Sequence, residues 1–152
     1  MTGARLSILF AAVALSPTVG LCQGDPEPSP EEVVNGLHES LASGDEEGVL
    51  ATLDAEVVIF ESGGAELSRD EYASHHLGAD MEFSAATQRD VIDQQVGQSG
   101  DLAWVLTRSQ TNGTFRGKDI DARGTETILL RHTPEGWRIM HIHWSSRSSA
   151  SE

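Results

Sequence analysis

The sequence contains only one cysteine among its 152 residues, and basic residues are scarce. A single thiol excludes an internal disulfide framework and any zinc site built on several thiolates. Lys and Arg number 10 against 24 Asp and Glu, which gives a formal net charge of −14. A protein this acidic repels phosphate backbones and anionic lipid surfaces. We therefore expect no nucleic-acid partner, and no membrane contact beyond an export signal.

Long apolar runs are also missing, apart from one near the start of the chain. The run over residues 6–15 follows Arg5 and is too short to span a bilayer. Gly20 and Cys22 place small residues at positions −3 and −1 of a cleavage site before Gln23. Residues 1–22 are therefore predicted to be a signal peptide, and the mature protein to be periplasmic or secreted. A lipoprotein acylated at Cys22 is the second interpretation, because a bulky leucine precedes that cysteine.

Several motifs of known chemistry do not occur. The sequence has no Gly-rich phosphate-binding loop, no Gly-x-Ser-x-Gly elbow and no His-Glu-x-x-His pattern. With 38% hydrophobic and 22% charged residues, the composition is typical of one globular domain. The Pro-rich residues 23–30 predict a disordered tether, residues 31–147 the domain, and residues 148–152 a disordered tail.

The first part of the domain is predicted to be helical. Residues 29–32, Ser-Pro-Glu-Glu, are typical of a helix start, and Gly44 ends the apolar pattern that follows. Asp45 begins a second, short helix. The capping box at residues 68–71 predicts a third helix, from about residue 69 to about residue 79.

The remaining chain is predicted to form strands. Residues 55–60, 90–96, 102–111, 120–131 and 137–146 have strand-like patterns separated by turn residues. Helices followed by a meander predict an α+β fold, in which three N-terminal helices cover one face of an antiparallel sheet.

Two segments within this order resemble a known superfamily. Residues 136–146 read Gly-Trp-Arg-Ile-Met-His-Ile-His-Trp-Ser-Ser, and residues 36–38 lead through Gly44-Asp45 into the strand at 53–58. This pattern resembles the nuclear transport factor 2-like superfamily, which includes SnoaL-like and ketosteroid isomerase-like proteins. The resemblance covers residues 31–147, and the most similar members are small exported bacterial proteins of unknown function.

The resemblance implies a cone: a strongly curved antiparallel sheet wrapped on helices, with a pocket open at one end. It also implies dimers that form through the sheet. The superfamily includes isomerases, cyclases, dehydratases and non-catalytic binding modules. An isomerase of this type needs a carboxylate base facing a tyrosine and a protonated acid. The single tyrosine, Tyr72, lies on the third predicted helix, which does not favour that chemistry.

Histidines provide the main candidate site. Strand alternation places His141 and His143 on the same face as Trp137 and Ile139. His76 and Asp80 recur four residues apart on the inner face of the third helix. We therefore expect His76, Asp80, His141 and His143 to converge beneath the sheet.

This convergence leaves three interpretations open. Three imidazoles and a carboxylate are suitable ligands for zinc or copper. Without a metal, the histidines would line a polar pocket or form structural hydrogen bonds. No other cofactor is expected.

Acidic and basic residues on the strands add further candidates. Glu61 ends the first strand, and burial there would raise the pKa of its carboxyl and suit it to act as a base. One of Arg108, Arg123 and Arg131 is expected to enter the pocket and bind a carboxylate.

Two functions from different classes follow. In the first, the domain binds a small polar or amphipathic molecule and catalyses a proton transfer, hydration or hydrolysis with His76, His141, His143 or Glu61. In the second, it is a non-catalytic dimeric module. The alternation predicts Met140, Ile142 and Trp144 on the outer face of the sheet, which favours a homodimer through that face.

Overall fold

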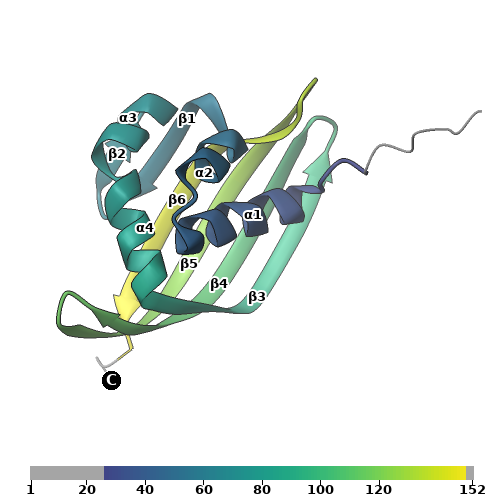
Figure 1. Cartoon of the computed structure of the whole chain (residues 1–152). Helices are drawn as coiled ribbons and strands as arrows, with labels where there is room; N and C mark the ends of the chain where they lie inside the picture. The colour runs from purple at the N-terminus through teal and green to yellow at the C-terminus, as the bar shows by residue number, and fades with distance from the viewer. Residues whose placement is uncertain (1–25, 150–152) are drawn as a thin grey trace, which may run out of the picture.

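The structure is a computed structural model that describes residues 26–149. The predicted signal peptide lies outside the described residues. Four helices pack on one face of a six-stranded curved sheet (Figure 1), which confirms the predicted α+β fold. Within residues 26–149, no helix has both the length and the apolar character needed to cross a bilayer.

Helix α1 (Pro30–Ser43) begins at the predicted cap. The Ser29 backbone N–H donates to the Glu32 carboxylate at 2.7 Å, and the Glu32 N–H donates to the Ser29 hydroxyl at 3.2 Å. This reciprocal pair satisfies two backbone donors of the first turn. Gly44 ends the helix with φ 72°, and Asp45 caps the short helix α2 (Glu46–Thr52).

The third predicted helix is broken at His76 into α3 (Arg69–His75) and α4 (Leu77–Ala86), so the three expected helices are four. In a continuous helix, Tyr72 and Asp80 would lie about 12 Å apart along the axis. In the structure the Tyr72 hydroxyl donates to Asp80 Oδ2 at 2.9 Å. The change of direction at His76 therefore brings these two side chains together.

The sheet has the order β2-β1-β6-β5-β4-β3. Its strands are β1 (Leu53–Glu61), β2 (Gly64–Glu66), β3 (Thr87–Ser99), β4 (Leu102–Phe115), β5 (Lys118–Thr133) and β6 (Gly136–Ser148). All neighbouring pairs are antiparallel except β1 and β6, which are parallel. The sheet is therefore mixed rather than wholly antiparallel. Parallel pairing is possible here because a long part of the chain separates the two strands.

The core lies between the helices and the concave face of the sheet. Alternate residues of the central strands point toward the helices, where they contact the apolar face of α1. The fully buried residues include Val34, Leu37, Val105, Ile128, Leu130, Ile139 and Ile142.

A β-bulge in β6 changes which side chains of that strand face the helices, compared with the predicted alternation. Leu129 pairs with His141 and Leu130 pairs with Ile139, so Met140 is an extra residue without a partner on β5. An extra residue reverses the alternation that follows it. Ile142 is therefore buried in the core, whereas His143 is exposed. The prediction that His141 and His143 share a face with Trp137 and Ile139 is wrong.

The ordered structure reaches slightly beyond the predicted domain at both ends. β6 continues to Ser148, and the Ser149 N–H donates to the Asp121 carbonyl at 2.8 Å. On the N-terminal side, Glu27 Oε1 lies 2.8 Å from His132 Nε2. Parts of the predicted tail and tether are thus attached to the domain.

Candidate functional site

A cavity of about 420 Å³ lies between the helices and the concave face of the sheet. Leu41, Phe83 and Phe115 supply apolar walls. The polar side of the lining comes from both layers, the helices and the sheet: His38, Glu61, Asp80, Arg89, Glu126 and Trp144. The cavity therefore combines apolar walls with a small number of ionisable groups, which is typical of small-molecule sites.

Glu126 is the centre of a polar network on the floor of this cavity. The residue is 6% exposed and lies on β5. His38 Nε2 is 2.8 Å from its carboxylate, Trp144 Nε1 donates to it at 2.6 Å, and Arg89 donates to its other oxygen at 3.2 Å. These contacts connect α1, β3, β5 and β6.

The network determines the charge of Glu126. Burial would raise the pKa of its carboxyl, but hydrogen bonding and charge from His38, the Arg89 charge and the Trp144 hydrogen bond together hold that pKa below its usual value of 4.5. Glu126 is therefore ionised at neutral pH and acts as a fixed anion.

A smaller cavity of about 180 Å³ adjoins the first. Glu61, Asp80 and Trp144 line both cavities, and Tyr72 and His76 line only the smaller one. Tyr72 is 1% exposed, and its hydroxyl donates to Asp80. The junction of the cavities thus brings two carboxyl groups together with the single tyrosine.

The two carboxyl groups at this junction have raised pKa values. Burial is the main cause for Glu61, and the negative charge of Asp80 adds to it, whereas the nearby His76 opposes the shift. Burial likewise raises the pKa of Asp80, against the hydrogen bond from Tyr72 and the charge of His76. The pKa of Tyr72 is also raised, mainly by burial and then by Asp80. Both carboxyls therefore keep a proton to higher pH than exposed ones do.

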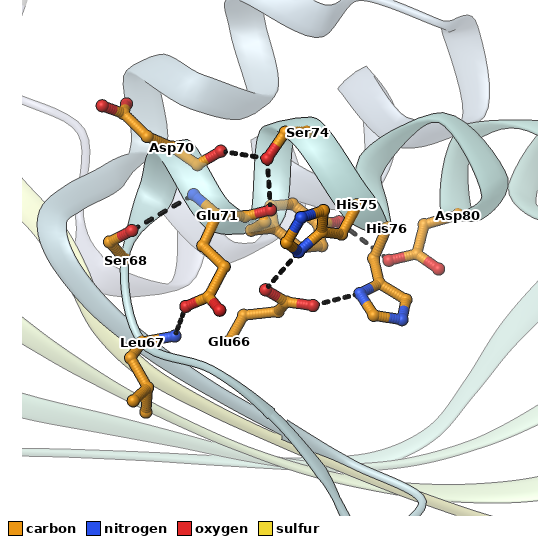
Figure 2. A network of polar contacts seen from close by, with 10 residues as sticks. Glu66, Leu67, Ser68, Asp70, Glu71, Ser74, His75, His76 and Asp80 are labelled. Atoms are coloured by element: carbon orange, nitrogen blue, oxygen red, sulfur yellow. Dashed lines mark hydrogen bonds and ion pairs between the residues drawn. The ribbon is translucent and has the colours of Figure 1, made fainter.

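His76 is oriented by a buried carboxylate. Figure 2 shows the Glu66 carboxylate between the rings of His75 and His76, with His76 Nδ1 in contact with Glu66 Oε1. His76 thus lines the smaller cavity while it remains bonded to β2.

The other two predicted histidines lie on the convex face of the sheet. The His141 ring packs edge-on against Phe60 with centroids 5.2 Å apart, and its Nδ1 is 2.8 Å from the Val58 carbonyl oxygen. The His143 ring also lies edge-on to Phe60, with ring centroids 6.4 Å apart. The predicted convergence of His76, Asp80, His141 and His143 is therefore wrong, and these four residues do not form a zinc or copper site.

Two arginines line the cavity, Arg89 and Arg116, and neither was among the three expected. Arg108 and Arg123 line a separate groove, and Arg131 lies opposite Arg138 on β6. Arg89 gave no signal in the sequence, because strand parity alone does not show which face of β3 is covered.

Glu126 did carry such a signal. It stands two and four residues before Ile128 and Leu130, so the alternation places a charged residue in phase with buried ones. A buried charge of this kind requires partners. The sequence could therefore have indicated a polar network at this position.

Comparison with known proteins identifies similar chains. The profile of the SnoaL-like domain matches residues 31–148. A candidate ketosteroid isomerase from Shewanella frigidimarina has a similar structure, with 38% identity and a TM-score of 0.72 over 74% of this chain and 91% of its own. No protein of curated function matches the sequence.

More distant structures share the fold. The hub domain of calcium/calmodulin-dependent protein kinase II from S. rosetta is 20% identical, with a TM-score of 0.66 over 82% of this chain and 98% of its own. A candidate dehydratase of the nuclear transport factor 2-like family from Streptomyces avermitilis is 20% identical, with a TM-score of 0.61 over 74% and 90%.

Proposed function

Because the chain belongs to the SnoaL-like family, we propose that its concave cavity binds a small amphipathic molecule and that Glu61 and Asp80 transfer a proton on it. One observation carries this proposal: two carboxyl groups with raised pKa values line the same cavity junction. The similarity to a candidate ketosteroid isomerase supports a carbonyl compound as the ligand class.

We assign the two carboxyl groups different roles in the transfer. Glu61 accepts no hydrogen bond from Tyr72, and in its ionised form it is the base that removes a proton from the carbon next to a carbonyl. We assign the proton to Asp80, whose pKa is raised by burial, and Asp80 would donate it to the carbonyl oxygen, where negative charge develops. Glu61 then returns the proton to another carbon of the same molecule, so nothing is consumed and the reaction needs no cofactor.

The lining of the cavity supports a ligand with one apolar and one polar end. Phe83 and Phe115 pack edge-on with centroids 5.3 Å apart and form an apolar wall. Arg116 lines the same cavity and is held by Glu82 at 2.6 Å. The ionised Glu126 disfavours an anionic group on the cavity floor.

The test is an isomerisation assay with a β,γ-unsaturated ketosteroid, whose conjugated product absorbs more strongly in the ultraviolet. Glu61→Gln is expected to lower turnover by about 10²–10⁴-fold, the usual contribution of a general base. Glu56→Gln, an exposed glutamate on the same strand, is the matched control. Equal turnover in wild type and Glu61→Gln would contradict the proposed base.

A second function, a non-catalytic homodimeric module, is favoured by the convex face of the sheet. Phe60, Trp104, Leu106 and Leu129 are exposed there at 37–42% each. An apolar surface of this kind is usually covered, and a similar fold forms a kinase hub. Ligand binding without turnover, together with a stable dimer, would favour this second function.

Export completes the proposal. The N-terminal pattern supports removal of residues 1–22, so the mature protein would begin at Gln23 in the periplasm or outside the cell. The protein can be expressed in a bacterial host and its intact mass measured. The mass distinguishes cleavage before Gln23 from acylation of Cys22. An uncleaved N-terminus would contradict export.

A further inference from the structure

We propose that Glu66, Glu71 and His75 form a binding site for a divalent transition-metal ion, which we call the β2–α3 site. None of its three residues lines the 420 Å³ cavity, and Glu66 also borders the adjoining 180 Å³ cavity. Its ligand atoms, one from each residue, all lie within 4.8 Å of one another.

Glu66 provides the strongest reason for a ligand here. Its side chain is 8% exposed, and its Oε2 has no hydrogen-bond partner among the described residues. His75 Nδ1 makes an ion-pair contact with this oxygen at 3.4 Å, without forming a hydrogen bond to it. A buried carboxylate oxygen without a hydrogen bond is costly, and a bound cation would remove that cost.

Helix geometry places the other two ligands beside this oxygen. Glu71 and His75 are four residues apart on α3, so their side chains lie on the same helix face. Figure 2 shows the carboxylates of Glu66 and Glu71 and the His75 ring on the same side of α3. Ligand atoms about 2.0–2.2 Å from a tetrahedral zinc ion lie about 3.4 Å apart. The 3.4 Å between His75 Nδ1 and Glu66 Oε2 already matches that spacing.

Neighbouring groups hold both carboxylates in place. The Leu67 N–H donates to Glu71 Oε2 at 2.7 Å, which leaves the other Glu71 oxygen for a metal. His76 Nδ1 contacts Glu66 Oε1, which leaves Oε2 directed toward His75. Hydrogen bonds of this kind orient metal ligands in known sites.

The ligand set indicates which metals fit. Two carboxylates balance the charge of a dication, and one imidazole favours zinc over magnesium or calcium. Three protein ligands leave one position for water or another molecule. The His75 side chain is 59% exposed, so an ion can enter from solvent.

The test is calorimetric titration of the metal-stripped protein with zinc chloride at neutral pH. Wild type is expected to bind one ion per chain, and His75→Ala to weaken binding at least tenfold. His132→Ala is the matched control, because it removes another exposed histidine that is paired with a glutamate. Wild-type affinity in His75→Ala would overturn the proposal, as would binding in all variants that does not saturate.

Cobalt(II) gives a second readout that does not depend on the stability of one variant. Substitution of zinc by cobalt should give visible absorption bands of a four-coordinate ion in wild type and in His132→Ala. Glu66→Gln and His75→Ala should lose them. Glu61→Gln should keep them, so failure of the proposed proton transfer and failure of this site are distinguishable. Equal bands in wild type and Glu66→Gln would contradict the assignment of Glu66.

Discussion

Glu126 and the pair Glu61 and Asp80 show how burial of the same chemical group leads to opposite outcomes. Glu126 meets His38, Arg89 and Trp144, which together outweigh the effect of burial on its pKa. Burial raises the pKa values of Glu61 and Asp80, and the charge of Asp80 adds to the rise at Glu61. The first carboxylate is suited to structure, and the other two are suited to proton transfer.

Substitution of Glu126 tests its structural role. Glu126→Gln should lower the free energy of unfolding by about 3–5 kcal/mol, the usual cost of removing one partner from a buried ion pair. Urea denaturation at neutral pH measures it, with the exposed Glu135→Gln as control. A loss below about 1 kcal/mol would mean that the network contributes little.

The same variant has a predictable pH dependence. The pKa of Glu126 is lower in the folded protein than its usual 4.5, so its stabilising effect is present above that value. The effect is lost as pH falls from 4.5 through the folded pKa, because the unfolded chain takes up the proton first. The stability difference between wild type and Glu126→Gln should therefore shrink in acid.

At the scale of elements, local sequence signals predicted the helices and most strands well. The capping box at Ser29 and the Ser68 cap mark the starts of α1 and α3, because each cap depends on residues three positions apart. The break at His76 was not predictable, since the contact between Tyr72 and Asp80 that accompanies it is made across space.

The candidate site was harder to predict than the fold, for the same reason. Glu61 and His76 do lie at the cavities, but His141 and His143 were placed by a parity that the bulge at Met140 reverses. No residue pattern around Met140 marks the bulge in advance. Its position depends on the register between β5 and β6, which the sequence of β6 alone does not contain.

The bulge itself can be tested. Deletion of Met140 forces either Trp137 and Ile139 or Ile142 and Trp144 out of the concave face. Exposure of two such side chains should cost about 3–6 kcal/mol of unfolding free energy. Met140→Ala keeps the extra residue and should cost far less. Equal urea midpoints for the deletion and Met140→Ala would show that the bulge does not determine the faces of β6.

For the whole molecule, the bulge changes which residues would form a dimer. Ile142 is fully buried and Trp144 donates to Glu126 on the concave side. The prediction that both lie on the outer face is therefore wrong. The convex face instead presents Trp104, whose indole lies against Gly97 with no room for a Cβ between them. The proposed interface therefore moves to the middle of β4 and β5.

Trp104→Asp tests this interface. Burial of Trp104 and Leu129 against a second copy would make both residues hot spots of the interface. A charge at position 104 should then weaken the dimer by about 2 kcal/mol or more. Leu67→Asp is the matched control, because Leu67 is 63% exposed and lies on the loop before α3. Sedimentation equilibrium should show dimeric wild type and Leu67→Asp, and largely monomeric Trp104→Asp with an unchanged helical circular-dichroism signal. A monomeric wild type at micromolar concentration would contradict the dimer, and a dimeric Trp104→Asp would place its interface elsewhere.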